Sequence, residues 1–190
     1  WKNNQAAIGG WLTLANGFSA EIMAHQGWDV LTIDMQHGLV NASELVPMLT
    51  AISTTEVTPF VRVPWLEPGI IMKVLDSGSY GVICPMINTR EDAERFVSYC
   101  RYAPEGTRSF GPSRAVIYAG EDYAQHANET ILTFAKSLPR SFNDAAIASQ
   151  VPLTSVLIIT LRVFLVDSCP RFSNKSPALS SFCFKSFFSF

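Results

Sequence analysis

The chain has 190 residues, a length typical of one domain, and 48% of them are hydrophobic. Because this much apolar material supports a buried core, the composition excludes a disordered protein. The formal net charge of −2 at pH 7 gives no basic excess for binding phosphates, so we expect no nucleic-acid partner.

Three features favour a cytoplasmic protein. The four cysteines form no C-x-x-C pair and have no regular spacing, which is typical of a reducing compartment. The sequence begins with no charged region followed by a long apolar run, so we expect no signal peptide. An apolar run at residues 151–166 is shorter than the roughly 20 residues that cross a bilayer and contains Arg162, so we expect no membrane partner.

The balance of charge changes near residue 135. Residues 1–135 contain 8 basic and 14 acidic side chains, whereas residues 136–190 contain 6 and 2. The last segment, residues 168–190, has no acidic residue and neither helical nor strand periodicity. We therefore predict a folded part over residues 1–135 and a divergent tail over residues 136–190.

The first 135 residues alternate between apolar runs and helical patterns. Strands are predicted at residues 7–14, 28–35, 57–64, 80–86 and 131–135. Helices are predicted at residues 18–27, 41–53, 67–78 and 89–103, with Asn41 or Ser43 capping the second and Thr89 the fourth. This alternation predicts an α/β fold in which crossover helices connect the strands of a parallel sheet.

Polar residues at the strand ends favour a (β/α)8 barrel over a doubly wound sheet. Asp34 and His37 follow the second strand, Arg62 lies near the end of the third, and Asn88 follows the fourth. In a TIM barrel the carboxyl ends of the strands form the active-site face, so these groups would converge there. A doubly wound sheet usually brings a phosphate-binding loop, and the sequence contains no G-x-G-x-x-G or Walker motif. Because a complete barrel takes about 250 residues, we predict an incomplete one.

Asp34 and His37 lie three residues apart, just beyond an apolar strand. This spacing lets one turn direct both side chains into one cleft, where Asp34 orients His37 or makes it a better base. The alternative is that Asp34 caps the turn and His37 is an ordinary polar loop residue. The pattern alone leaves both interpretations open.

Arg62 is flanked by apolar residues on a strand that we expect to be buried. Since an isolated buried charge is costly, Arg62 needs a partner, which is either an anionic substrate or a structural ion pair with Asp34 or Asp76. Asp76 lies at the end of a predicted helix, and the alternative to a paired Asp76 is an ordinary exposed residue at the C-terminus of this helix. In a glycine-containing loop, Arg108 and Ser109 either bind an anion or hold the loop together.

Four segments resemble the HpcH/HpaI aldolase family, which is related to the 4-hydroxy-2-oxoheptanedioate aldolases. They are GGWLTLANGFSAEIMAHQGWDVLTIDMQHG, TPFVRVPW, GVICPMINTREDAERFV and RYAPEGTRSFGPSRA, and the resemblance covers residues 8–135. It implies a (β/α)8 barrel, usually hexameric, that uses Mg²⁺, Mn²⁺ or Co²⁺ to cleave 4-hydroxy-2-oxo acids reversibly to pyruvate and an aldehyde. It further implies that His37 is the catalytic base, that Arg62 stabilises the transition state, and that Asp76 raises the basicity of the histidine.

The chain departs from this family where the metal-binding carboxylates are expected. The family usually shows Q-I-E-T on the fifth strand and G-P-x-D-L on the next, and the Glu and Asp of these motifs bind the metal. Here KSLP and ITLRVF occupy these places, so Leu138 replaces the Glu and Arg162 lies near the position of the Asp. We therefore expect that this chain lacks the metal ligands.

Two hypotheses for the function follow. The first is a metal-dependent aldolase that acts on a small 2-oxo acid as a homo-oligomer, with this chain an incomplete or altered copy. A shifted reading frame or a mispredicted exon boundary would produce such a copy. The second is a noncatalytic barrel fragment that acts only by associating with intact subunits. The carboxylate pair is the sequence feature that separates the two.

Overall fold

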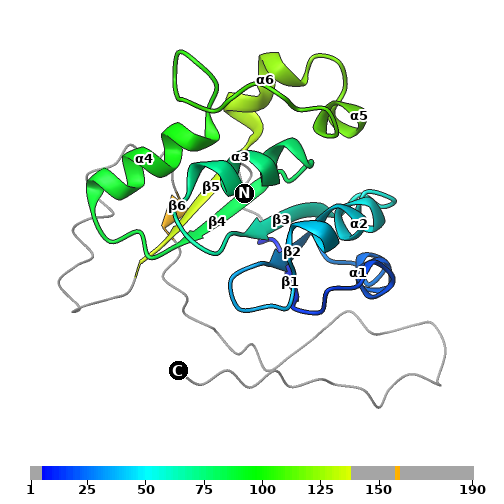
Figure 1. Cartoon of the computed structure of the whole chain (residues 1–190). Helices are drawn as coiled ribbons and strands as arrows, with labels where there is room; N and C mark the ends of the chain where they lie inside the picture. The colour runs from blue at the N-terminus through cyan, green and yellow to red at the C-terminus, as the bar shows by residue number, and fades with distance from the viewer. Residues whose placement is uncertain (1–5, 138–156, 159–190) are drawn as a thin grey trace, which may run out of the picture. The chain divides into compact units, whose positions relative to one another are not determined.

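The computed structural model describes residues 6–137 and 157–158, and its strands and helices alternate along the chain (Figure 1). The strands are β1 (Gly9–Leu12), β2 (Val30–Asp34), β3 (Thr58–Arg62), β4 (Gly81–Pro85), β5 (Leu132–Lys136) and β6 (Leu157–Ile158). The helices are α1 (Gly17–Ala24), α2 (Ala42–Ile52), α3 (Pro68–Asp76), α4 (Arg90–Cys100), α5 (Ala115–Ala119) and α6 (Tyr123–Thr130). All nine elements predicted from the sequence are therefore present, each within a few residues of its expected position.

The helices begin where side chains accept hydrogen bonds from the first turn. Asn41 and Glu44 form a capping box at the start of α2, and the Thr89 side chain accepts a hydrogen bond from the Asp92 amide at the start of α4. Both positions agree with the caps predicted from the sequence. Such side chains satisfy amide groups that have no partner within the helix.

The sheet is parallel throughout, and its strands follow one another in chain order from β1 to β6. A doubly wound sheet would reverse its strand order at a switch point, whereas a barrel adds each strand beside the previous one. The predicted barrel type is therefore confirmed over the described strands. Strand β5 ends at Lys136, one residue beyond the predicted end of the folded part, and most of the predicted divergent tail lies outside the described residues.

The two faces of the sheet have different roles. The outer face packs against the helices through the main hydrophobic core, which includes Leu31, Val61 and Val82. The inner face holds a smaller cluster of Phe60, Ile83 and Phe134. Since side chains alternate between faces along a strand, the last residues of β2, β3 and β5 lie on the inner face. In the part of the chain that the structure describes, no helix is long and apolar enough to cross a membrane.

Candidate active site at the carboxyl ends of the strands

Asp34 and Arg62 form a buried ion pair at the carboxyl edge of the sheet. They are the last residues of β2 and β3 and lie side by side in the strand register. Arg62 donates from Nε to Asp34 Oδ1 at 2.9 Å and from Nη2 to Asp34 Oδ2 at 2.6 Å. Asp34 is 1% exposed and Arg62 8% exposed. Of the partners that the sequence left open for Arg62, the structure therefore shows the ion pair with Asp34.

Three further donors approach the Asp34 carboxylate. Trp11 donates its indole N–H to Oδ2 at 3.1 Å, and the backbone amides of Gln36 and His37 donate to Oδ1 at 3.0 and 3.2 Å. Burial alone would raise the pKa of Asp34, but the hydrogen bonds, with that of Arg62 foremost, lower it to about 2. Asp34 is therefore a carboxylate at neutral pH.

His37 is held by its backbone in the turn that follows β2. Its amide is bound to Asp34, while its side chain is exposed. Gly38 follows directly, and a Cβ on this residue would lie 2.3 Å from the Asp34 carbonyl oxygen, so only glycine fits this close approach. Asp34 thus caps the turn, as one of the two interpretations of this motif expects, and the turn lies at the carboxyl edge of the sheet. Among the described residues, no hydrogen bond or ion pair joins the Asp34 carboxylate to the His37 imidazole, so a role of Asp34 towards that side chain stays a prediction.

The ends of β4 and β5 complete the described part of this edge. Met86, directly after β4, has φ of 59°, a conformation that few residues other than glycine adopt and that often occurs at functional sites. Asn88 donates from its side-chain amide to the Met86 carbonyl at 3.2 Å. Lys136, the last residue of β5, is half-buried on the inner face. The edge therefore presents Arg62 and Lys136 as cations, of which only Arg62 has a carboxylate partner among the described residues.

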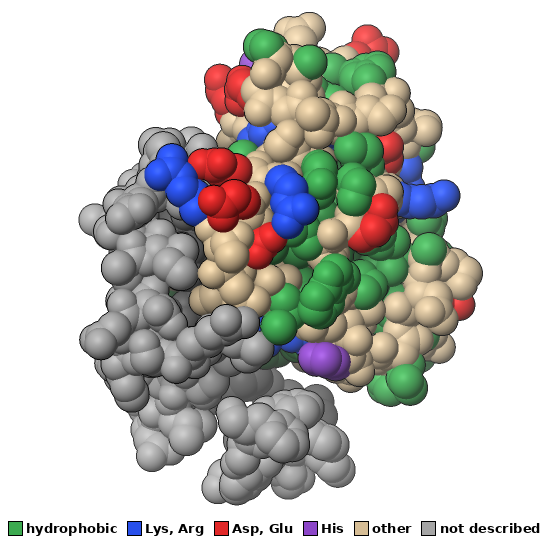
Figure 2. All heavy atoms as spheres, turned by 60° about the vertical axis from the view of Figure 1, so that its left-hand side comes forward, with side chains coloured by type: hydrophobic (Ala, Val, Ile, Leu, Met, Phe, Trp, Pro, Cys, Tyr) green, Lys and Arg blue, Asp and Glu red, His purple; other side chains and the backbone are tan. Residues whose placement is uncertain are grey.

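Apolar side chains are exposed in the loops that follow the strands. Leu14, Leu39 and Trp65 lie in the loops after β1, β2 and β3, and each is exposed. Figure 2 brings forward the side to which the strands point in Figure 1 and shows hydrophobic side chains gathered there between charged ones. A surface of this kind is typical of a binding site or an interface.

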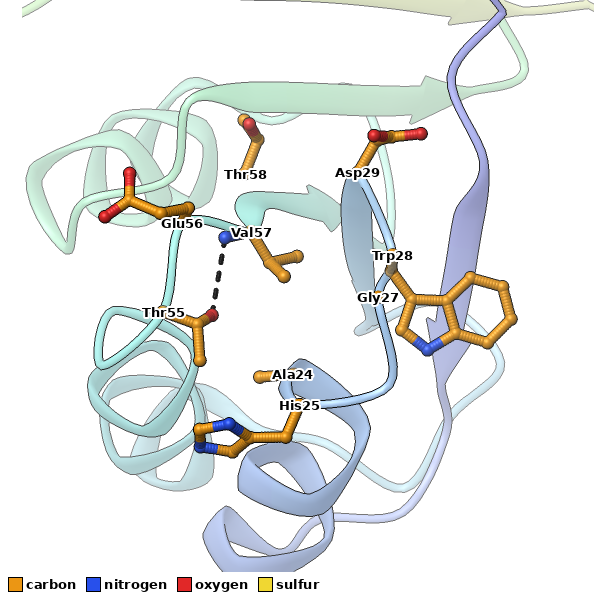
Figure 3. Close-up of a pocket in the computed structure, with 9 residues that line it drawn as sticks. All are labelled: Ala24, His25, Gly27, Trp28, Asp29, Thr55, Glu56, Val57 and Thr58. Carbon is orange, nitrogen blue, oxygen red and sulfur yellow. Dashed lines mark hydrogen bonds between the residues drawn. The ribbon is translucent and has the colours of Figure 1, made fainter. Parts of the chain in front are cut away.

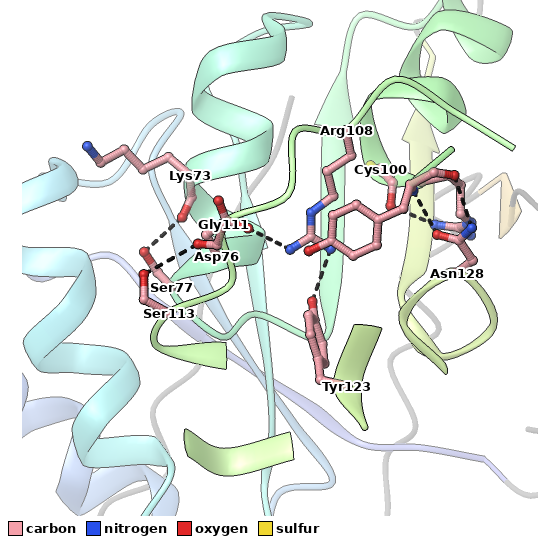
Figure 4. A network of polar contacts seen from close by, with 11 residues as sticks. Lys73, Asp76, Ser77, Cys100, Arg108, Gly111, Ser113, Tyr123 and Asn128 are labelled. Atoms are coloured by element: carbon pink, nitrogen blue, oxygen red, sulfur yellow. Dashed lines mark hydrogen bonds and ion pairs between the residues drawn. The ribbon is translucent and has the colours of Figure 1, made fainter. Parts of the chain in front are cut away.

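Asp76 and Arg108 lie at the amino end of the sheet, opposite the end at which β2 leads into the turn with His37. Figure 4 shows the contact between the two side chains. Asp76 ends α3, which leads back to the amino end of β4, and Arg108 follows α4. Their ion pair, from Arg108 Nη2 to Asp76 Oδ1, measures 2.8 Å. With strands of five residues, the two ends of the sheet are about 13 Å apart. Within the described residues of this one chain, no hydrogen bond or ion pair joins Asp76 to His37.

Arg108 is enclosed by two tyrosines. Its side chain is 0% exposed, it donates from Nη1 to the Tyr123 hydroxyl at 3.0 Å, and its guanidinium carbon lies 4.4 Å from the ring centre of Tyr102. Burial raises the pKa of Tyr102 to about 12, so this hydroxyl remains neutral. Ser109 beside it is exposed. Of the two interpretations of this loop, the contacts favour the structural one for Arg108.

A separate pocket lies at the amino ends of β2 and β3 (Figure 3). It has a volume of about 610 Å³ and is lined by Ala24, His25, Gly27, Trp28, Asp29, Thr55, Glu56, Val57 and Thr58. In TIM barrels this end of the sheet contributes to stability and the carboxyl end carries the chemistry. We therefore place the candidate site at Asp34, His37 and Arg62.

The described residues do not fit a divalent metal. They contain no group of three or more His, Cys, Asp or Glu side chains that could hold one. At the carboxyl edge, Asp34 is already paired with Arg62, and Lys136 adds a positive charge. Mg²⁺ requires several oxygen ligands, and cations nearby would repel it. The two positions at which the sequence predicts lost ligands, Leu138 and Arg162, lie outside the described residues.

Comparisons with known proteins agree with the resemblance seen in the sequence. The family model of HpcH/HpaI aldolase/citrate lyase matches residues 7–153, and so extends beyond residue 135. The hydroxypyruvate/pyruvate aldolase of Rhizorhabdus wittichii is 42% identical over 135 residues, which are 71% of this chain and 54% of that protein. The 5-keto-4-deoxy-D-glucarate aldolase of Escherichia coli is 35% identical over 158 residues, which are 81% of this chain and 62% of that protein.

A solved structure shows the same arrangement. The crystal structure of an HpcH/HpaI aldolase/citrate lyase family protein from Burkholderia cenocepacia matches with a TM-score of 0.67 and 30% identity, over 75% of this chain and 58% of that one. The chain thus spans a little more than half the length of these relatives. The matched residues include the strands that carry Asp34 and Arg62 and the turn that carries His37. The chain belongs to the HpcH/HpaI aldolase/citrate lyase family.

Proposed function

We propose that this chain carries the base and the anion-stabilising arginine of an aldolase that cleaves 4-hydroxy-2-oxo acids to pyruvate and an aldehyde. The observation that carries this proposal is the shared anchoring of Arg62 and His37 to one carboxylate. Asp34 binds the Arg62 guanidinium through two hydrogen bonds and the His37 backbone through a third. One carboxylate thereby binds a cation at the end of β3 and the backbone of the turn that carries His37 after β2.

Each of these side chains suits one part of aldol cleavage. In the proposed reaction, His37 accepts the proton of the 4-hydroxyl group as that oxygen becomes the aldehyde carbonyl. The C3–C4 bond breaks, and its electron pair passes towards C2, which leaves pyruvate as its enolate. Arg62 donates hydrogen bonds to the oxygen on which negative charge develops. The enolate then takes up a proton at C3 and becomes pyruvate.

The proposal includes dependence on a divalent metal, because the resemblance to the family implies it. A bound metal would supply polarisation of the 2-oxo group. The described residues do not provide its ligands, and the sequence has Leu138 in place of the expected Glu and Arg162 near the expected Asp. The steps assigned to His37 and Arg62 therefore rest on these two side chains alone.

The relatives support the substrate class. One is named a hydroxypyruvate/pyruvate aldolase and the other a 5-keto-4-deoxy-D-glucarate aldolase. Both names indicate 2-oxo acids or their aldol products. The cations Arg62 and Lys136 at the carboxyl edge of the sheet would attract the carboxylate of such a molecule.

A noncatalytic barrel fragment is the second candidate, and the replacement of both expected carboxylates favours it. Transcript sequencing across residues 136–164 separates the two candidates. If it restores Q-I-E-T and G-P-x-D-L, the aldolase describes the true product. If it confirms KSLP and ITLRVF, the result supports the noncatalytic barrel fragment.

The proposed roles are tested in a repaired chain, in which Q-I-E-T and G-P-x-D-L replace KSLP and ITLRVF. Pyruvate release from a 4-hydroxy-2-oxo acid is measured with Mg²⁺, Mn²⁺ or Co²⁺ for the repaired chain and its His37→Ala and Arg62→Lys variants. We expect each variant to lower kcat by about 100-fold or more. Full activity without His37 or Arg62 would refute the assignment.

A further inference from the structure

We infer that Trp11 is a positioning residue of this site, because it holds the Asp34–Arg62 pair in the orientation in which Arg62 meets the developing negative charge. Trp11 lies on β1, next to β2 in the sheet. Its indole N–H lies 3.1 Å from Asp34 Oδ2, and the Arg62 guanidinium carbon lies 4.9 Å from the centre of its ring. Trp11 therefore contacts both members of the ion pair. This inference rests on the proposed function, since it gives Arg62 its role.

The contacts around Asp34 leave its carboxylate no freedom to rotate. Oδ1 accepts from Arg62 Nε and from two backbone amides, and Oδ2 accepts from Arg62 Nη2 and Trp11. Five donors thus occupy about four lone-pair positions. Among the described residues, Trp11 is the one side chain besides Arg62 that donates a hydrogen bond to Asp34. Its loss leaves Oδ2 bound to Arg62 alone, so no hydrogen bond from β1 holds this side of the ion pair among the described residues.

The indole ring also fixes the plane of the guanidinium. A cation near the face of tryptophan is attracted by the ring, so the indole favours a guanidinium that lies over it. Arg62 Nε and Nη2 are bound to Asp34, and Nη1 makes no hydrogen bond within the described part of the chain. Trp11 and Asp34 together leave Nη1 as the donor available to a substrate oxygen.

Trp11 contributes little to the hydrophobic core. It is 43% exposed on the inner face of β1, whereas its neighbour Leu12 is buried in the main core on the outer face. An apolar side chain that remains this exposed adds less to stability than a buried one. A Trp11 variant therefore separates the effect on Arg62 from an effect on folding.

The test compares Trp11→Phe with the matched control Trp28→Phe in the chain as it exists. Phenylalanine keeps a ring at position 11 but removes the donor to Asp34. Trp28 lies at the amino end of β2, and its indole nitrogen is buried without a hydrogen-bond partner among the described residues. Both variants thus lose one indole, and only one of them loses a contact with the ion pair.

The measurement is the solvent exchange rate of the Arg62 Nε proton by NMR at neutral pH, with the signal assigned through Arg62→Lys. We expect exchange to become about tenfold faster in Trp11→Phe, as the loss of one hydrogen bond predicts, and to be unchanged in Trp28→Phe. Equal rates in Trp11→Phe and the parent chain would overturn the inference. Equal acceleration in both variants would overturn it as well, because it would indicate a general loss of stability.

A kinetic experiment in the repaired chain adds an independent readout. If Trp11 acts through Arg62 in the transition state, Trp11→Phe lowers kcat about tenfold and leaves the KM for the 4-hydroxy-2-oxo acid unchanged. A change in KM alone would contradict the positioning role. An inactive repaired chain combined with faster Arg62 exchange in Trp11→Phe would refute the proposed function and leave the contact between Trp11 and the ion pair established.

Discussion

At the scale of single residues, Asp34 connects the parts of the candidate site. A buried carboxylate is costly unless its oxygens are paired, and the hydrogen bonds of Asp34 reach β1, β3 and the turn after β2. Arg62 is the main partner because its planar guanidinium matches both oxygens of the carboxylate. The ion pair therefore stabilises the sheet edge and positions the site at the same time.

Replacing Asp34 with asparagine is predicted to destabilise the fold strongly. Asp34→Asn leaves Arg62 buried without a counter-charge, and the loss of one partner of a buried pair costs about 3–5 kcal/mol. Urea unfolding at pH 7 measures this loss. Glu94→Gln is the control, because its ion pair with Arg90 is exposed and screened by solvent, so its loss is expected to change the free energy of unfolding little. Similar losses in both variants would contradict the importance of the buried pair.

The ion pair also predicts how the free energy of unfolding depends on pH. The pKa of Asp34 is about 2 in the folded chain, below its ordinary value of 3.8. Because the folded state binds this proton less readily than the unfolded state, Asp34 stabilises the fold fully above about pH 4. This contribution is lost as the pH falls towards 2.

Urea unfolding of the parent chain and Asp34→Asn between pH 5 and pH 2.5 checks this dependence. The difference in stability between the two is expected to shrink as the pH falls. The comparison matters because Glu44, Glu67 and Asp92 also have lowered pKa values and contribute to the acid response of both proteins. A constant difference over the whole range would refute this role of Asp34.

At the scale of elements, the turn between β2 and α2 determines where His37 lies. Gly38 is predicted to be the most sensitive position of this turn, since a Cβ would meet the Asp34 carbonyl oxygen at 2.3 Å. Gly38→Ala must therefore shift backbone, at a cost of about 1–3 kcal/mol by analogy with overpacking. Gly9→Ala is the control, because its Cβ would find no atom closer than 3.9 Å. Urea unfolding that shows no difference between the two variants would contradict this close approach.

The sequence predicted the elements that carry the site better than those that do not. Continuous apolar runs identified β1 to β5, and the parallel order then brought Asp34 and Arg62 together at the strand ends. Helices α5 and α6 were missed, because α5 has five residues and α6 buries only Tyr123 and Ala127, which is too few to give a periodic pattern. No cap hydrogen bond marks the start of either helix.

Contacts between segments that are distant along the chain could not be predicted from the sequence. Asp76 and Arg108 are 32 residues apart and meet because α3, which ends at Asp76, and α4, which precedes Arg108, both return to the amino end of the sheet. Trp11 on an apolar strand resembles an ordinary core residue, and only the register of β1 beside β2 shows that its indole reaches Asp34. The role of Asp76 towards His37, which the family resemblance implies, stays a prediction.

At the scale of the whole molecule, the described strands form one consecutive part of a barrel. Phe60, Ile83 and Phe134 lie on its inner face, and β1 pairs only with β2 among the described strands. Relatives of this chain are longer, since it spans 54% and 62% of the two aldolases compared. The His37 and Arg62 positions lie within the matched part, whereas the loss of the metal ligands, predicted from Leu138 and from Arg162 near the expected Asp, stays a prediction.

The central claim is that this chain contains the base and the arginine of an aldolase site but lacks its metal-binding carboxylates. Pyruvate release from a 4-hydroxy-2-oxo acid tests it most directly, measured for the chain as written and for the repaired chain with Mg²⁺, Mn²⁺ or Co²⁺ added. We predict negligible release by the chain as written, since its aligned ligand positions offer no carboxylate. We predict release by the repaired chain that a chelator abolishes. Robust, chelator-sensitive turnover by the chain as written would contradict the account and show that the alignment of its second part is wrong.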